Sequence, residues 1–265
     1  MMDAQSLPEN ESGTSGRWRG PWRPLWLALA WLLLILVLAT VAGALTGIAF
    51  DRLTGVDGPR AYAVGDLQAL TTKRLAAVLF AFQATVGAGV LMAARRYDRL
   101  GLELLPLVLP KSGIKWFVLS VAGLFLISAL YGGAVYQFDR SGMSQDLGPF
   151  AEMMRTDAWW LVLAAAGIGA PIAEEFLFRG LLYGFLREAP SGKVLAGILT
   201  AAAWATLHIN YAIYGIVAIF LIGLYFAWLR EASRSLLPPL VCHAVYNSLI
   251  VLALRASPEF AAAAG

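Results

Sequence analysis

The sequence is poor in the residues on which many catalytic and metal-binding motifs depend. Its single cysteine, Cys242, lies in an apolar stretch, which excludes a disulfide framework and any zinc motif built from cysteines. There are only two histidines, and charged residues make up 14% of the chain against 59% hydrophobic residues. The net charge of +3 is small, and the basic residues lie at the ends of apolar segments, so nucleic acid is not expected as a partner.

What the sequence has in abundance is long apolar runs. A mean hydropathy of +0.69 is far above that of soluble globular proteins and predicts an all-α, polytopic transmembrane helical bundle in the lipid bilayer. About seven spans are expected, with six to eight compatible with the pattern. They are Leu25–Phe50, Lys73–Ala94, Lys115–Phe138, Ala158–Leu186, Val194–Asn210, Tyr214–Leu229 and Leu236–Leu254. The short stretch 100–110 is bounded by proline and is expected to be interfacial or re-entrant.

Charge and composition divide the chain further. We expect a disordered cytoplasmic tail over 1–24, N-terminal transmembrane helices over 25–157, a C-terminal helical core over 158–255 and a C-terminal tail over 256–265. Arginine and tryptophan alternate just before the first apolar run, which is typical of an uncut signal anchor. The strongly basic loops alternate with loops of mixed charge, so the N-terminus is predicted to be cytoplasmic in a multi-pass protein of the cell membrane.

The fourth predicted span contains three charged residues in the stretch PIAEEFLFRG. On a helix Glu175 and Arg179 share a face and can pair, whereas Glu174 points about 100° away and has no partner in its own helix. An ionised group at membrane depth is costly unless it is paired or hydrated. We therefore interpret Glu175 and Arg179 as a supporting ion pair and Glu174 as a candidate functional residue.

Both histidines also fall within predicted spans, where they could share a site with Glu174. His208 has Trp204 four residues before it, and His243 has Asn247 four residues after it, so each pair lies on one helix face. Trp204 could wall a pocket, and Asn247 could donate a hydrogen bond. One carboxylate and two imidazoles from three spans would form one site if the helices converge.

Two chemistries fit this set of side chains. Glu174, His208 and His243 could bind zinc and leave a fourth position open for water. Without a metal, the glutamate could take a proton from water while a histidine orients that water or protonates the leaving group. Both versions predict hydrolysis by activated water. The sequence contains neither H-E-x-x-H nor a G-x-S-x-G motif with a partner histidine.

The motifs EEFLFRG, WATLH and HAVYN, in this order, resemble those of the CPBP family, the CAAX-processing and bacteriocin-processing intramembrane endopeptidases, also called the Abi family. The resemblance covers about Ala158–Leu254 and makes 158–255 the catalytic core. Trp204 departs from the family pattern, which usually has phenylalanine there, and this difference bears on substrate fit more than on catalysis.

The resemblance implies a membrane protease that hydrolyses peptide bonds of a peptide or membrane-protein substrate. By this likeness Glu174 and His208 would activate water, while His243 and Asn247 would complete the site and stabilise the oxyanion. Glu175, Arg179 and Trp204 would support it. Zinc is an expected cofactor only in the metalloprotease version, and no other cofactor is expected. The substrate and the oligomeric state are not specified by the sequence; the alternative functions are a proton- or ion-coupled transporter and a non-catalytic membrane scaffold.

Overall fold

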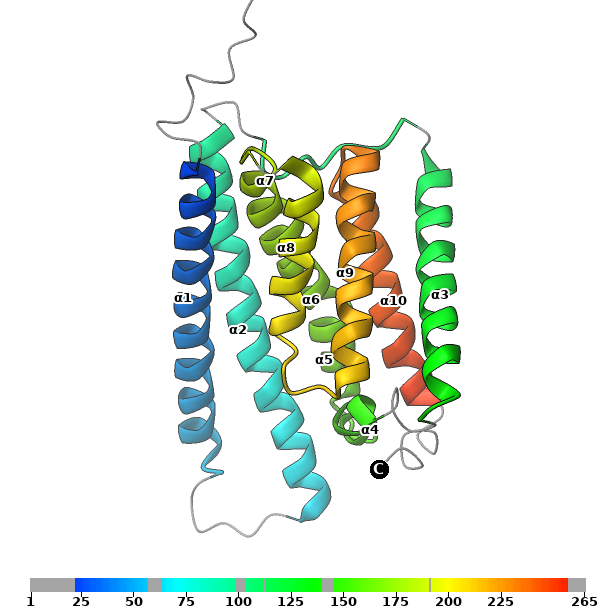
Figure 1. Cartoon of the computed structure of the whole chain (residues 1–265). Coiled ribbons are helices and arrows are strands. Elements are labelled where there is room, and N and C mark those ends of the chain that lie inside the picture. Colours follow the sequence, from blue (N-terminus) through cyan, green and yellow to red (C-terminus); the bar gives the residue numbers. More distant parts are fainter. Residues whose placement is uncertain are drawn as a thin grey trace, which may run out of the picture.

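The computed structural model describes residues 22–56, 63–98, 103–111, 113–139, 145–190 and 192–256. These residues form helices and connecting turns, with no strand among them, and the predicted all-α bundle is confirmed (Figure 1). The elements are α1 (Arg23–Thr54), α2 (Val64–Asp98), α3 (Ile114–Tyr136), η1 (Gln145–Leu147), α4 (Gly148–Met154), α5 (Trp159–Val162), η2 (Leu163–Gly169), α6 (Ala170–Glu174), η3 (Glu175–Leu182), α7 (Tyr183–Leu186), α8 (Gly192–Thr206), α9 (Ile213–Ser233) and α10 (Leu237–Ala256).

Six helical stretches in the described part of the chain are long and apolar enough to cross a bilayer. The predicted span Val194–Asn210 is the exception, because its helix α8 has 15 residues and ends at Thr206. At about 1.5 Å per residue α8 is about 22 Å long, short of the roughly 30 Å of a hydrocarbon core. Near Trp204 the backbone hydrogen bonds tighten to three-residue turns, and the chain continues as a non-helical link, 207–212, to α9.

The helices alternate in direction, so their ends define two faces of the bundle (Figure 1). The start of α1, the link from α2 to α3, and the turns α7–α8 and α9–α10 lie at one face, which we call the basic face. The ends of α1 and α10 lie at the opposite face together with α4, and we call it the α4 face. The described basic residues near the ends of helices at the basic face are Arg23, Arg95, Arg96, Lys111, Lys115, Arg187, Lys193, Arg230 and Arg234.

Small residues let α1 lie against α2. The buried face of α1 repeats every four residues at Ala39, Gly43 and Gly47, and a Cβ at either glycine would press on Val78 or Arg74 of α2. Close helix approach through small residues is a common basis of helix association in membranes. At the α4 face the pair is closed by a bidentate contact from Arg74 to Asp51, whose shorter N–O distance is 2.6 Å.

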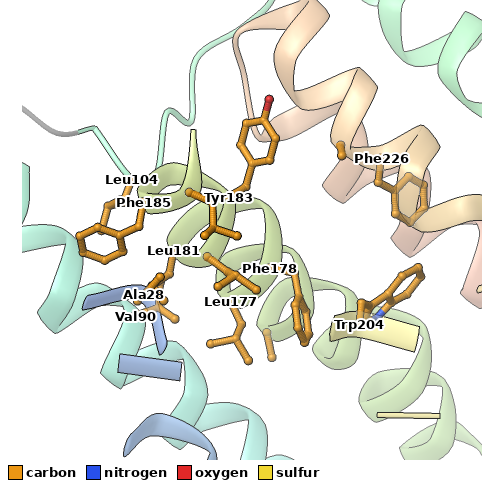
Figure 2. Packing of buried hydrophobic residues seen from close by; sticks show 14 of the residues in the cluster. Ala28, Val90, Leu104, Leu177, Phe178, Leu181, Tyr183, Phe185, Trp204 and Phe226 are labelled. Carbon is orange, nitrogen blue, oxygen red and sulfur yellow. The ribbon is translucent and has the colours of Figure 1, made fainter. Parts of the chain in front are cut away.

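Residues Trp159–Leu186 form one continuous helical stretch, which we call the central helix; it comprises α5, η2, α6, η3 and α7. Two of its segments, η2 and η3, are π-helical, with one extra residue per turn. From Leu177 to Leu186 every residue is buried. Figure 2 shows Ala28 and Val90 packed on one side of η3 and Trp204 and Phe226 on the other. The central helix is therefore the core around which the other helices pack.

The stretch before α3 contains no helix over Glu103–Pro110, as predicted for a segment that is not a span. Its Leu104 is fully buried, and its Pro106 carbonyl accepts a hydrogen bond from the backbone N–H of Leu236. Ser235 and Leu236 are also fully buried, so the start of α10 is covered by protein at the basic face. Irregular backbone at this depth is tolerated because it is buried against protein.

Candidate active site

A cavity of about 390 Å³ extends through the half of the bundle nearer the α4 face. Its walls come from η1, α4, the end of α6, the end of α8 with the following link, α9 and α10. Most of the lining is apolar. The predicted site residues among the lining are Glu174, Trp204, His208, His243 and Asn247.

Glu174 lies at the junction of α6 and η3 and has its polar contact on another helix. Its Oε2 accepts a hydrogen bond of 2.6 Å from Nε1–H of Trp204. Trp204 is 4% exposed and lines the cavity, as predicted for a residue that walls a pocket.

Glu175 and Arg179 form an ion pair in the protein interior, with both side chains 0% exposed and an N–O distance of 3.1 Å. Arg179 also donates to the carbonyl of Gly223 at 3.3 Å. Its guanidinium lies over the indole of Trp204 at 4.4 Å and near the ring of Phe226 at 5.2 Å. The predicted turn of Glu175 towards Arg179 is thus present, and the pair lies directly behind the cavity wall.

His243 joins the two glutamates. Its Nδ1 is 3.0 Å from Oε1 of Glu175, and its Nε2 is 3.9 Å from Oε2 of Glu174. A carboxylate oxygen accepts, so Nδ1 carries the proton and Nε2 faces Glu174 as a base. The ring is 3% exposed and is held between Trp204 and Phe226.

The sequence placed His208 within a helix, but in the structure it lies two residues beyond the end of α8, in the turn of the link 207–212. Its Nδ1 is 3.2 Å from the Trp204 carbonyl, which can only accept, so Nδ1 donates and Nε2 is again the basic nitrogen. The ring packs edge-on against Trp204 and Tyr211. Two imidazoles with their basic nitrogens in the same tautomeric form line the same cavity.

The first π-helical segment positions Asn247. In a π-helix the carbonyl register shifts, and three successive carbonyls of η2 accept side-chain hydrogen bonds. Gln83 of α2 donates to Ala165 at 3.0 Å, Asn247 of α10 donates to Ala166 at 3.1 Å, and Ser248 donates to Gly167 at 3.2 Å. Because Ala166 accepts, the amide of Asn247 must present its NH₂ on this side, and one N–H remains for the cavity.

Glycines in η2 allow the side chains of Gln83 and Ser248 to come close to its backbone. A Cβ at Gly169 would clash with Oε1 of Gln83, and a Cβ at Gly167 would lie 2.8 Å from Oγ of Ser248. The small residues of LAAAGIG therefore allow α2 and α10 to bring polar side chains to the backbone of η2. Gln83 and Ser248 were not predicted from the sequence, because nothing in their local pattern distinguishes them from other polar residues in a span.

Counting residues along straight helices from the basic face predicts depths of about 18 Å for Glu174, 21 Å for His208 and only about 10 Å for His243. In the structure the imidazole of His243 contacts both glutamates despite this difference. Residue counts along straight helices therefore did not predict which side chains meet. The prolines 238 and 239, expected to mark an irregular start, lie in the first turn of the regular helix α10, and the irregular backbone is confined to 234–236 just before it.

Zinc requires a defined group of side-chain donors around one point. A tetrahedral site needs three protein donors within about 2.0–2.2 Å of one point. Among the residues that the structure describes, no three His, Cys, Asp or Glu side chains are grouped to hold a metal ion. The residues as they lie therefore do not form the set Glu174, His208 and His243, and zinc binding stays a prediction.

Several cavity residues lie outside the predicted motifs. Asp146, Leu147 and Phe150 come from η1 and α4, and Tyr211 comes from the link after His208. Burial raises the pKa of Tyr211 to about 12, and the carboxylates of Asp146 and Glu174 act in the same direction. Of these residues only Tyr211 could have been predicted from the sequence, because it lies three residues after His208. The segments η1 and α4 are distant from the motifs in sequence.

The chain was compared with known proteins. No curated protein and no solved structure matches it. Residues 156–249 match the family model described as "Type II CAAX prenyl endopeptidase Rce1-like", a segment that contains all three motifs and the described core of the site. Residues 156–249, which include Glu174, His208, His243 and most of the cavity lining, are thus similar to the Rce1-like family of CAAX endopeptidases, as the resemblance to the CPBP family predicts.

Proposed function

We propose that this protein is an intramembrane endopeptidase in which Glu174 activates a water molecule to hydrolyse a peptide bond. The observation that carries the proposal is the separation of 3.9 Å between Oε2 of Glu174 and Nε2 of His243 at the wall of a cavity. This distance is too long for a direct hydrogen bond and suits a water that contacts both atoms at about 2.8 Å. The family match makes peptide-bond hydrolysis the reaction expected of such a water.

In the proposed reaction the Glu174 carboxylate takes one proton from the water as its oxygen attacks the carbonyl carbon. The tetrahedral intermediate carries its negative charge on the former carbonyl oxygen. The free N–H of Asn247 is suited to donate to this oxyanion. Glu174 then gives the proton that it took from the water to the departing nitrogen, the C–N bond breaks, and the products are an amine and a carboxylic acid, which loses its proton to solvent.

The two histidines have basic nitrogens available for these proton transfers. The Nδ1–H of His243 is held by Glu175, and that of His208 by the carbonyl of Trp204, so Nε2 is the accepting atom in both. His208 is proposed to orient the water with Glu174, while Nε2 of His243 accepts a hydrogen bond from the water's second O–H and the His243 ring holds the geometry of both carboxylates. Glu175 and Arg179 stay a supporting pair, because they are fully buried behind the wall.

Zinc is the alternative means of activating the same water. Metal-free and zinc-dependent hydrolysis differ in one measurement, the metal content of active protein. Purified protein should be assayed with and without a chelator while bound metal is determined in the same sample. Retained activity at less than about one metal per ten chains would support the glutamate mechanism, and loss restored by zinc alone would establish the metalloprotease.

The proposed substrates are peptides or membrane proteins that reach the cavity within the bilayer, and prenylated C-terminal peptides are one candidate from the family's description. We further propose that the basic face is cytoplasmic, because lysine and arginine gather there. A reporter fused after Gln5 should then be cytoplasmic, and one inserted near Gln145 extracytoplasmic. The opposite result at both positions would reverse the orientation.

The proposed function is tested by cleavage of a peptide and membrane-protein substrate library by purified protein. Glu174→Gln keeps an oxygen that can accept from Trp204 but removes the base, so it should abolish cleavage and leave purification yield near that of the wild type. His208→Ala should reduce cleavage strongly at similar yield. Wild-type rates in Glu174→Gln would refute the proposed role.

A further inference from the structure

Asp146 lies in the cavity wall, in η1, and contacts the link that carries His208. Its Oδ1 accepts a hydrogen bond of 2.8 Å from the backbone N–H of Ala212. Its Oδ2 lies over Gly215, which also lines the cavity, and a Cβ at Gly215 would clash with that oxygen. The absence of a side chain at Gly215 is thus what gives the carboxylate its place beside the start of α9.

The charge of the lining is one-sided. Among the lining residues in the described part of the chain, Asp146 and Glu174 are acidic, and none is lysine or arginine. Arg179, the nearest buried cation, is behind Trp204 and committed to Glu175. Tyr211, whose pKa is raised to about 12, contributes a neutral hydroxyl at ordinary pH. A cation in this cavity would meet two carboxylates, whereas the only described lining side chains that can carry a positive charge are the imidazoles of His208 and His243.

The carboxylates of Asp146 and Glu174 lie at different positions along the cavity. Asp146 belongs to the segment that lies at the α4 face, whereas Glu174 is part of the central helix and contacts His243 deeper in the bundle. Apolar side chains of Leu147, Phe150 and Ile250 also line the cavity. A bound chain with its scissile bond at Glu174 would therefore place apolar groups along this wall and another residue beside Asp146.

We propose that Asp146 is a specificity-determining residue that pairs with a cationic group of the substrate, a lysine or arginine side chain near the scissile bond. The inference rests on the proposed endopeptidase function and names the substrate class for the same site. A carboxylate in a partly buried cavity attracts a cation more strongly than it would in water, because the local dielectric is lower.

The test uses full-length protein in detergent and quenched fluorescent peptides in matched sets. Each set holds an apolar peptide with lysine, norleucine or glutamate at one position, scanned on both sides of the cleaved bond. For the best position, kcat/KM should be about five- to tenfold higher for lysine than for norleucine, and lowest for glutamate.

Asp146→Asn is the matched variant, because asparagine keeps an oxygen that can accept from Ala212 while the charge is removed. The lysine-to-norleucine ratio should fall to about one in this variant. Glu152→Gln is the control. Glu152 is exposed on α4 and does not line the cavity, so this substitution removes one negative charge without changing the lining. Its ratio should match the wild-type ratio.

Measurements of peptide binding distinguish a failure of this inference from a failure of the proposed endopeptidase function. In Glu174→Gln, lysine peptides should bind about five- to tenfold more tightly than norleucine peptides, and adding Asp146→Asn should remove the difference. If the wild type cleaves nothing but the binding preference is present, the endopeptidase proposal fails and the cation preference stands. If cleavage occurs and neither the rate nor the binding depends on the lysine, or Asp146→Asn leaves the preference unchanged, the inference is overturned.

Discussion

Replacing Arg179 with alanine should destabilise the protein more than the loss of any surface charge. The guanidinium and the Glu175 carboxylate are both 0% exposed and 3.1 Å apart. Removing one partner of such a buried pair leaves the other charge without compensation, at a cost of about 3–5 kcal/mol. Loss of the contacts with Trp204 and Phe226 adds about 0.5–2 kcal/mol. His243 keeps one hydrogen bond to Glu175 and offsets part of the loss.

The measurement is thermal unfolding of detergent-solubilised protein, followed by the decay of the monodisperse peak in size-exclusion chromatography. A loss of about 4 kcal/mol corresponds to a fall in apparent Tm of roughly 10 °C for a chain of this size. The control is Lys193→Ala, because Lys193 lies 3.7 Å from Glu231 with 67% of its side chain exposed, and such pairs contribute at most about 1 kcal/mol.

A double-mutant cycle identifies the cause of the loss. Glu175→Gln and Arg179→Met should each destabilise alone, whereas the double variant removes both charges and should be more stable than the sum of these two losses by at least about 2 kcal/mol. Additive losses, or a Tm for Arg179→Ala within about 2 °C of the wild type, would refute the view that an uncompensated buried carboxylate drives the effect.

Two further predictions concern residues around the site. Trp204→Phe removes the N–H that contacts Glu174 while keeping an aromatic wall, so kcat should fall about tenfold with little change in Tm; an unchanged kcat would mean that this hydrogen bond does not orient the carboxylate. Gly169→Ala should lower Tm because its Cβ would displace the amide of Gln83 from the π-helix, whereas Gly87→Ala, with no atom within 4 Å of its Cβ, should keep or raise Tm; equal Tm values for the two variants would contradict the proposed role of the close approach.

The fold class followed from the sequence because every spanning helix must satisfy its backbone polar groups internally, and long apolar runs leave no other structure in a bilayer. The candidate site residues also came from the sequence. Ionisable side chains are costly at membrane depth but not in loops, so a carboxylate and two histidines within predicted spans indicate a functional site. The pairing of Glu175 with Arg179 followed from their four-residue spacing. For this pair, the periodicity of a single helix was enough.

Interactions between helices were decided only by the tertiary structure. The sequence assigned His208 to a span, but α8 ends at Thr206 and the histidine lies in a turn. It suggested that Glu174 and His243 share a site, and their side chains lie 3.9 Å apart, but it did not predict that Nδ1 of His243 contacts Glu175. Local spacing fixes which side chains share a helix face, whereas helix ends, π-helical turns and starting depths depend on packing against other helices. That is why Asp146 and Gln83, far from the motifs in sequence, had no detectable signal and appear at the site only in the folded protein.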